Sequence, residues 1–204
     1  MSDHPDFGFS PFDFISPSEF GFFTPVECGY PLLSPHWCLS RDGDPAGYAL
    51  YRRHYSAAKN NRAAKNSPAK RRHARTRRKQ QKKQRQFVGP GQSLVLLGTD
   101  VLSLLVWQRA KYRQDGQLGI NCAVFRNEGK ALSSLLIAEA SHLAWRKWPG
   151  ERRFMFVDAQ KVRPKRDPAR CFRKASWQPV GKSKGGLLIL ATELPAITLQ
   201  NIIR

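Results

Sequence analysis

Three consecutive residues, His54, Tyr55 and Ser56, bring together a general base, a phenolic acid and a hydroxyl. Asp158 follows the apolar run RFMFV, so it is expected at the carboxyl end of a buried strand, where ligands bind in open α/β sheets. A carboxylate at that place is a general base or a metal ligand, and the alternative is a cap or a salt bridge to nearby Lys161 or Arg163. Three adjacent residues do not make a site by themselves, so surface residues without a catalytic task are the alternative for the tripeptide.

The sequence RNEGKA, which begins at Arg126, has the pattern R-x-x-G-x-A at a predicted strand-to-helix junction. A glycine-containing turn that opens a helix directs backbone N–H groups and the positive end of the helix dipole at an anion. A pyrophosphate is the natural occupant of such a turn, and an ordinary β–α connection is the alternative. The residues expected to bind the cofactor through this turn are Arg126, Asn127, Gly129, Lys130 and Ala131.

Basic residues are concentrated in one segment of the chain. The net charge is +20, and residues 52–86 hold fifteen of the 35 Lys and Arg but no Asp or Glu. Lys and Arg that meet phosphates release counterions, so the segment predicts nonspecific, salt-sensitive binding of nucleic acid, with a solubilising insertion as the alternative. It has too few apolar residues to form a core and is expected to be disordered or a solvated helix when free. The residues expected to contact nucleic acid are Lys70, Arg71, Arg72, Arg75, Arg77, Arg78, Lys79, Lys82, Lys83, Arg85, Lys182 and Lys184.

Hydrophobic periodicity predicts the elements that position these residues. The expected strands are 93–100, 102–109, 120–128, 153–159 and 185–193, and the expected helices are 132–148 and 167–177. A tight Gly-Thr-Asp turn joins the first two strands, and Asp167-Pro168 is expected to open the second helix as its N-cap and first residue. This order predicts an α+β fold with a mixed sheet flanked by helices.

The chain divides by composition into unlike segments. Residues 1–37 contain seven Phe among prolines and glycines, which predicts an irregular segment that drapes over the fold or binds a partner. The folded domain is expected over residues 38–204, interrupted by the basic insertion at 57–86. No apolar run is long enough for a membrane span and no secretory leader is recognisable, so neither is expected. The four separated cysteines form no CxxC pair, which indicates neither a zinc ribbon nor a disulfide scaffold and favours a reducing cytoplasm.

These motifs in this order resemble the GNAT acyltransferase family, whose pyrophosphate loop Q/R-x-x-G-x-G/A is matched by Arg126, Gly129 and Ala131. In that fold a hairpin precedes two parallel strands that splay around acetyl-CoA. A closer resemblance, over about Trp37 to Leu190, is to phage and bacterial DNA-modification enzymes of the Mom type. The motifs that carry it are WCLSRDGDPAGYALYRRHYS, QFVGPGQSLVLL, FRNEG, FVD, KVRPKRDPARCF and KGGLLIL.

The resemblance implies a GNAT-like fold and an enzyme that transfers an acetyl-CoA-derived group to adenine N6 in DNA. Mom-type enzymes form an N6-carbamoylmethyl derivative of adenine with acetyl-CoA and iron. The residues that the resemblance assigns to catalysis are His54, Tyr55, Asp158 and Ser133, with the first three also as iron ligands and Ser134 as an alternative, cofactor-binding serine. Phe172 stands where the family has a tyrosine on its last helix, which many GNAT enzymes use as a general acid.

The expected partner is double-stranded DNA, from which the target base must be flipped out. The Phe-rich N-terminal segment or Trp107 is the expected stacking surface. No membrane partner is expected, a homodimer is left open, and the expected location is the cytoplasm of a bacterium that hosts a phage or prophage. Two alternatives remain: a GNAT acetyltransferase acting on a protein or small amine, and a DNA-binding protein without activity on a GNAT scaffold.

Overall fold

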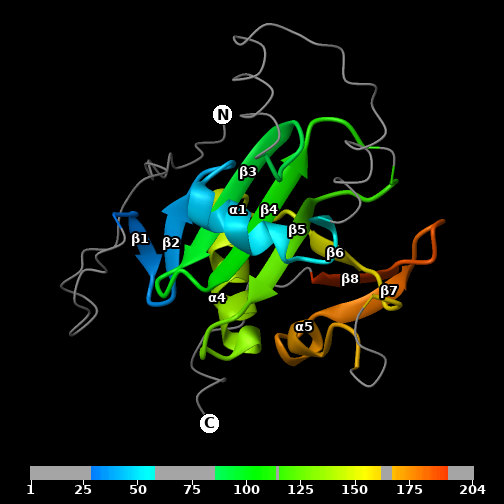
Figure 1. Cartoon of the computed structure of the whole chain (residues 1–204). Helices are drawn as coiled ribbons and strands as arrows, with labels where there is room; N and C mark the ends of the chain where they lie inside the picture. Colours follow the sequence, from blue (N-terminus) through cyan, green and yellow to red (C-terminus); the bar gives the residue numbers. More distant parts are fainter. Residues whose placement is uncertain (1–28, 58–85, 114, 162–166, 193–204) are drawn as a thin grey trace, which may run out of the picture.

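A mixed sheet forms the centre of the molecule. The computed structural model describes residues 29–57, 86–113, 115–161 and 167–192, which form one eight-stranded sheet in the order β1-β2-β3-β4-β5-β6-β8-β7 and three helices (Figure 1). The strands are β1 (Leu32–Ser34), β2 (Trp37–Ser40), β3 (Gly91–Gly98), β4 (Ser103–Ala110), β5 (Ile120–Asn127), β6 (Arg153–Val157), β7 (Gln178–Lys182) and β8 (Leu188–Thr192). The helices are α1 (Pro45–Arg52), α4 (Ser133–Lys147) and α5 (Arg170–Lys174). The predicted α+β class with a mixed sheet is confirmed.

One pair of neighbouring strands, β5 and β6, is parallel, and every other pair is antiparallel. The pair is parallel because α4 carries the chain back across the sheet between the two strands. Their register contains only Ile120 opposite Arg153 and Asn121 opposite Phe154, both at the starts of the strands. The strands therefore part toward their carboxyl ends, where the β5–α4 turn and Asp158 follow.

Two hydrophobic clusters lie on opposite faces of the sheet, one under α4 and the other under α1 (Figure 1). The indole N–H groups of Trp37 and Trp107 donate to the carbonyls of Leu136 and Ala140 in α4, at 2.9 and 3.0 Å. These bonds satisfy the polar atoms of two large buried rings and fix α4 on its face of the sheet. Trp107 is 0% exposed, so the expectation that it stacks on a DNA base is wrong.

Four of the predicted strands, 93–100, 102–109, 120–128 and 153–159, are confirmed as β3, β4, β5 and β6, with ends shifted by up to two residues. The predicted helix 132–148 is α4, and the predicted strand 185–193 contains β8. The elements that were not predicted are β1, β2, α1 and β7. β1 lies inside the segment 1–37, which was expected to be irregular; residues 1–28, and residues 58–85 of the basic insertion, lie outside the described residues.

The second predicted helix, 167–177, is wrong in its extent, because α5 contains only five residues. Ala169 and Ser176, with φ of 60° and 65°, take the left-handed conformation on either side of α5, and an L-residue in that conformation interrupts a right-handed helix. Asp167 is not its N-cap: that position belongs to Ala169, and the Asp167 carboxylate forms an ion pair with Arg173.

Candidate functional site

Three side chains that were expected in the active site, His54, Tyr55 and Asp158, line one pocket. The pocket has a volume of about 160 Å³. Its walls come from the turn after α1, from β5 and β6, and from the residue before β8. The other residues that line it are Ser56, Asn121, Cys122, Ala123, Phe156, Lys161 and Leu187. Residues about a hundred positions apart in the chain thus meet beside the parted strands β5 and β6.

The helix that presents the tripeptide, α1, begins at a complete N-cap. Asp44 Oδ1 accepts hydrogen bonds from the N–H groups of Ala46 at 2.9 Å and Gly47 at 3.0 Å, and Pro45 occupies the first turn. The other carboxylate oxygen of Asp44 accepts a hydrogen bond of 2.6 Å from the hydroxyl of Tyr30. The start of α1 is therefore fixed both within the helix and to the segment before β1.

The tripeptide follows α1 in tight turns and not in a strand. The N–H of His54 donates to the carbonyl of Tyr51 at 2.9 Å, and the N–H of Ala57 donates to the carbonyl of His54 at 3.0 Å. In such turns adjacent side chains can face the same way, and the rings of His54 and Tyr55 lie 4.3 Å apart between centroids in the pocket wall. Ala57 is buried in the cluster under α1, which anchors the end of the turn.

His54 is held as a neutral imidazole. Burial lowers its pKa from 6.5 to about 4, and the positive charge of Arg126 acts in the same direction. The backbone N–H of Ser56 donates to Nδ1 of His54 at 3.3 Å, and the Ser56 hydroxyl lies 2.8 Å from the same nitrogen. A backbone N–H can only donate, so Nδ1 is the acceptor and the proton of the neutral ring is on Nε2.

Burial keeps two other groups of the pocket, Tyr55 and Cys122, in their protonated forms. Burial raises the pKa of Tyr55, and the charge of Asp158 adds to this although the backbone of Asp158 donates to the phenol oxygen. Burial also raises the pKa of Cys122, whose thiol donates to the carbonyl of Val124 at 3.7 Å. Tyr55 is therefore a proton donor at neutral pH, and Cys122 is not a thiolate nucleophile.

The carboxylate of the pocket belongs to Asp158, directly after β6, as the sequence predicts. Lys161 Nζ lies 3.4 Å from its Oδ2, so the ion pair that was an alternative to a catalytic role is present. Both residues line the pocket, so the pairing does not remove the carboxylate from it. Asn121 in β5 was not predicted as a site residue; an amide within the apolar run INCAVF was the available signal.

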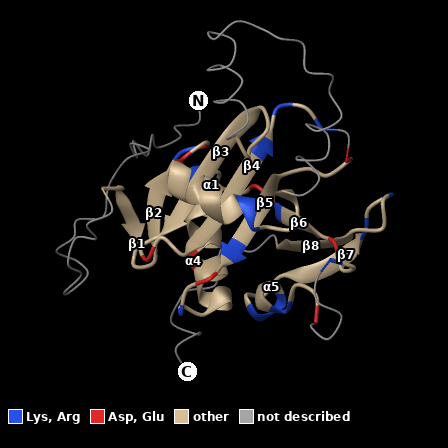
Figure 2. Ribbon diagram, in the orientation of Figure 1, with Lys and Arg blue, Asp and Glu red and all other residues tan. Residues whose placement is uncertain are grey.

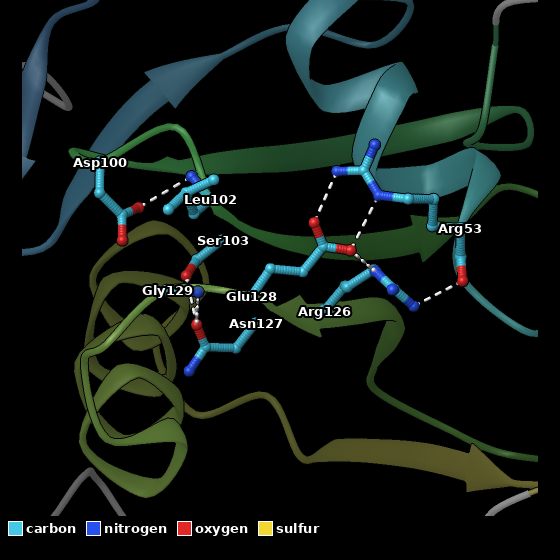
Figure 3. Close-up of polar contacts among 8 residues, drawn as sticks. All are labelled: Arg53, Asp100, Leu102, Ser103, Arg126, Asn127, Glu128 and Gly129. Carbon is cyan, nitrogen blue, oxygen red and sulfur yellow. Dashed lines mark hydrogen bonds and ion pairs between the residues drawn. The ribbon is translucent and has the colours of Figure 1, made fainter.

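The turn from β5 to α4 is organised by the side chain of Asn127 (Figure 3). Its Oδ1 accepts hydrogen bonds from the hydroxyl of Ser103 at 2.8 Å and the N–H of Gly129 at 2.9 Å. Its Nδ2 donates to the carbonyl of Ala131 at 2.7 Å and to Ser133 Oγ at 3.0 Å. Asn127 therefore shapes the turn from inside, and Ser133 belongs to this network and does not line the pocket.

Arg126 connects the same turn to the end of α1 (Figure 3). Its guanidinium donates to the carbonyl of Arg53 and to the carboxylate of Glu128, which also receives two hydrogen bonds from Arg53, at 2.7 and 2.8 Å. The hydrogen bond from Arg53, followed by that from Arg126, lowers the pKa of Glu128 from 4.5 to about 2. We call Arg53, Arg126 and Glu128 the arginine–glutamate bridge; it fixes the residue before His54 to the end of β5.

The first turn of α4 offers backbone N–H groups, as the R-x-x-G-x-A pattern predicts. Leu132 at the N-cap makes no side-chain cap, and the first turn contains no acid. Lys130 is exposed beside it, and Ser134 is half-buried in it. A Cβ on Gly129 would lie 2.1 Å from Asp100 Oδ2, so this carboxylate adjoins the turn and would have to move to admit a larger residue. The predicted anion site thus combines an uncapped helix start with an acidic neighbour.

Phe172, which stands where the GNAT resemblance expects a tyrosine, is a packing residue. Phe172 is 3% exposed, and its ring contacts those of Phe125 and Trp177 at 5.5 and 5.2 Å between centroids. It belongs to the cluster under α4 and does not line the pocket. A proton donor for the pocket must therefore come from another residue.

The donor set does not fit the iron site that the resemblance implies. Among the described residues, no three His, Cys, Asp or Glu side chains are grouped to hold a metal ion. His54 and Asp158 are two suitable donors, but the raised pKa of Tyr55 keeps its phenol protonated and that of Cys122 keeps its thiol protonated. These side chains therefore do not make up the iron site that the resemblance implies.

Two of the twelve basic residues expected to bind nucleic acid lie in the described part of the chain. Lys182 ends β7 and Lys184 lies in the turn before β8, both exposed (Figure 2). The other ten, from Lys70 to Arg85, lie outside the described residues. Figure 2 also shows Lys and Arg on the β4–β5 loop and on α5.

Comparison of the chain with protein-family models, with curated proteins and with solved structures finds no match. The molecule is described by its fold and its site: an α+β fold whose parallel strand pair opens beside a pocket lined by an imidazole, a phenol and a carboxylate. Of the helices in the described parts of the chain, none is long and apolar enough to cross a membrane.

Proposed function

We propose that this protein is a nucleobase-modifying transferase of the GNAT type, similar to the Mom enzymes, which transfers an acetyl-CoA-derived group to the N6 amine of adenine in DNA. The observation that carries the proposal is the meeting of His54, Tyr55 and Asp158 in one pocket. The resemblance singled out these three residues from two separate segments, and the fold brings them together.

The strand arrangement supports the GNAT part of the proposal. The β3–β4 hairpin precedes β5 and β6, which are parallel and paired only at their starts. In the GNAT fold, a hairpin followed by two splayed parallel strands surrounds acetyl-CoA, and this resemblance supports the proposal. The pocket lies beside the opening, where a group on the acyl carbon and a group on the acceptor could meet.

The uncapped start of α4 supports binding of the acyl-CoA pyrophosphate. The N–H groups of the first turn and Lys130 would hold the phosphates, because a helix start carries partial positive charge. Acyl-CoA, when bound, supplies an acyl carbon activated as a thioester. The side chains of Arg126 and Asn127 shape the turn and would act on the cofactor only through its backbone.

Proton transfers in the pocket follow from the states of its groups. In acyl transfer the N6 nitrogen bonds to the acyl carbon and loses a proton, which leaves an N6-acetyl group on adenine and not the carbamoylmethyl group of the Mom enzymes. The carboxylate of Asp158 is the base that lines the pocket. When the carbon–sulfur bond breaks, the thiolate needs a proton, and the protonated phenol of Tyr55 can donate it. Tyr55 would thus take the role that Phe172 cannot perform. His54 would orient the substrate through Nε2–H, since its Nδ1 is engaged by Ser56.

The basic segment supports DNA as the substrate. The chain has a net charge of +20, and a plain acetyltransferase of proteins or small amines leaves the acid-free segment 52–86 unexplained. A DNA-binding protein without activity is favoured by two observations, the buried ring of Phe172 and the engagement of Arg126 with Glu128. Affinity for acetyl-CoA separates that protein from either enzyme.

Nucleoside mass spectrometry of DNA from bacteria that express the protein tests the proposal, with Asp158→Asn as the matched control. A nucleoside heavier than deoxyadenosine that is absent from the control would support it and identify the group. An unchanged spectrum from protein that binds acetyl-CoA would favour the plain acetyltransferase. An unchanged spectrum without acetyl-CoA binding would favour the inactive DNA-binding protein.

A further inference from the structure

The loop between β4 and β5 carries the two most exposed large hydrophobic side chains of the described residues. Tyr112 is 73% exposed and Leu118 is 83% exposed. Apolar side chains that stay exposed to water do not contribute the favourable free energy of burial. An exposed ring and an exposed aliphatic group on one loop are therefore a candidate contact surface. We call Lys111–Arg113 and Gln117–Gly119 the β4–β5 arm; position 114 lies outside the described residues.

The arm is held against the sheet by arginines. The guanidinium groups of Arg113 and Arg152 lie 4.7 and 5.6 Å from the centroid of the Phe154 ring. Arg113 donates to the carbonyl of Gln117, and Arg152 donates to its side-chain oxygen at 3.1 Å. These bonds fix the base of the arm and leave the Tyr112 ring at its surface.

Cations surround the exposed groups of the arm. Lys111 Nζ lies 5.4 Å from the centroid of the Tyr112 ring, and Arg113 and Arg152 lie at the base. The acid nearby, Asp115, accepts a hydrogen bond of 3.0 Å from the N–H of Gln117. Three cations against one acid, around an exposed aromatic ring, match the phosphates and base faces of nucleic acid.

The arm adjoins the pocket through two aromatic rings. Phe154, which carries the two arginines, lies 5.6 Å from Phe156 between ring centroids, and Phe156 lines the pocket. Asn121, another residue of the pocket wall, pairs with Phe154 in the sheet. A duplex held on the arm would therefore have one of its bases near the pocket mouth.

We infer that the β4–β5 arm is the surface that grips DNA around the flipped base, with Leu118 entering the vacated stack and Tyr112 stacking on a neighbouring base. The inference rests on the proposed function and adds to it the element that keeps the base extruded. Apolar side chains that enter a base stack stabilise the unstacked duplex, and aromatic rings stack on any base. The positive charges of Lys111 and Arg113 lie where the flanking phosphates would pass.

The test uses a pool of short duplexes that carry 2-aminopurine at one central position between random flanks. Its fluorescence rises when the base leaves the stack, and this readout does not require catalysis. The full chain, Leu118→Ala, Tyr112→Ala and Tyr112→Phe are compared at protein saturation. Leu32→Ala is the matched control, because Leu32 is 41% exposed on β1 at the far edge of the sheet.

We expect Leu118→Ala and Tyr112→Ala to reduce the fluorescence gain at least about fivefold, from the loss of one stacking contact. Tyr112→Phe and Leu32→Ala should keep the gain of the wild type. Equal gains in all variants would overturn the inference while DNA modification, measured separately by nucleoside mass spectrometry, could still support the proposed function. A wild-type gain without any modified nucleoside would overturn the proposed function alone. No wild-type gain at all, or a change of oligomeric mass in Leu118→Ala, would overturn the arm as a DNA contact.

Discussion

Removing the charge of Glu128 tests how the arginine–glutamate bridge holds the site. Glu128→Gln keeps the shape of the side chain but leaves Arg53 and Arg126 without their common carboxylate. The backbone of residue 53 precedes His54, so the loss of this ion pair loosens the turn that presents the imidazole. We expect a loss of stability and a slower rate of DNA modification, with the DNA affinity nearly unchanged.

The size of the stability loss follows from the pKa of the carboxyl. A fall from 4.5 to about 2 corresponds to about 3 kcal/mol if it were expressed in full, at about 1.4 kcal/mol per pH unit. The side chains of Arg53 and Glu128 are 49% and 26% exposed, so solvent screens the interaction. We therefore expect about 1 kcal/mol of lost unfolding free energy at neutral pH.

The pH dependence gives the sign of the effect. The pKa of Glu128 is lower in the folded protein than in the unfolded chain, so its contribution is present above pH 4.5 and is lost as the pH falls toward 2. Urea unfolding of the wild type and Glu128→Gln should thus differ at pH 7 and converge near pH 2. A difference that is the same at both ends of this range would refute the reasoning.

Glu151→Gln is the matched control for this experiment. Glu151 is 28% exposed and pairs with the single guanidinium of Arg109 at 2.7 Å, whereas Glu128 is 26% exposed and serves two arginines. We expect the control to lose no more than about 0.5 kcal/mol and to keep its rate of modification. An equal loss of unfolding free energy in both variants would mean that the effect is common to surface carboxylates and is not specific to the arginine–glutamate bridge.

Three further substitutions and one titration test other parts of the site. Asp158→Asn should abolish modification while DNA binding persists; an active mutant would remove the carboxylate from the mechanism. Tyr55→Phe should lower the rate of modification roughly 10²-fold or more in single-turnover assays, with acetyl-CoA affinity retained. In an NMR titration the imidazole of His54 should lose its proton with a midpoint near 4, so a midpoint near 6.5 would contradict its burial. Gly129→Ala should cost about 1 kcal/mol in thermal unfolding, because its Cβ would displace the Asp100 carboxylate, which accepts a hydrogen bond of 2.9 Å from the N–H of Leu102, and the same change should cost almost nothing further in an Asp100→Ala chain.

The sheet could be predicted where its strands are long and apolar. β3, β4 and β5 each span eight residues, and their pattern is visible in the sequence. β1 and β2 have three and four residues, too few for a period to emerge. They are defined by the pairing of β2 with β3 and of β1 with β2. β7 could not be predicted because all five of its residues are exposed, so no apolar pattern marks it in the sequence.

The same dipeptide gave a correct and an incorrect signal for a helix. Asp44-Pro45 caps α1, which was not predicted, whereas Asp167-Pro168 was expected to cap a helix and does not. The difference lies in the residue that follows: Ala46 donates to the aspartate, while Ala169 takes a left-handed conformation. A cap motif therefore indicates a position where a helix can begin, and whether a helix forms there depends on the conformation and packing of the residues that follow.

The candidate site was predictable in its chemistry and less so in its support. Residue type and the resemblance together indicated His54, Tyr55 and Asp158, which share the pocket. The bridge between Arg53 and Glu128 joins residues 75 positions apart, and neither neighbouring sequence signals the other. Arg126 was expected to bind a cofactor, and in the structure its guanidinium donates to the carbonyl of Arg53, next to His54.

The two ends of the basic segment have a consequence for how substrate reaches the pocket. Ala57, directly after the pocket residue Ser56, and Phe87, whose ring lies 5.5 Å from that of Tyr51, are buried in the same cluster under α1. The basic segment between them is therefore anchored at both ends by described residues, next to the pocket residue Ser56. If its arginines and lysines bind DNA as proposed, they keep the duplex near the pocket at an effective concentration on the order of millimolar, whatever the dilution outside. Successive bases of one molecule would then be presented to the pocket before the DNA dissociates.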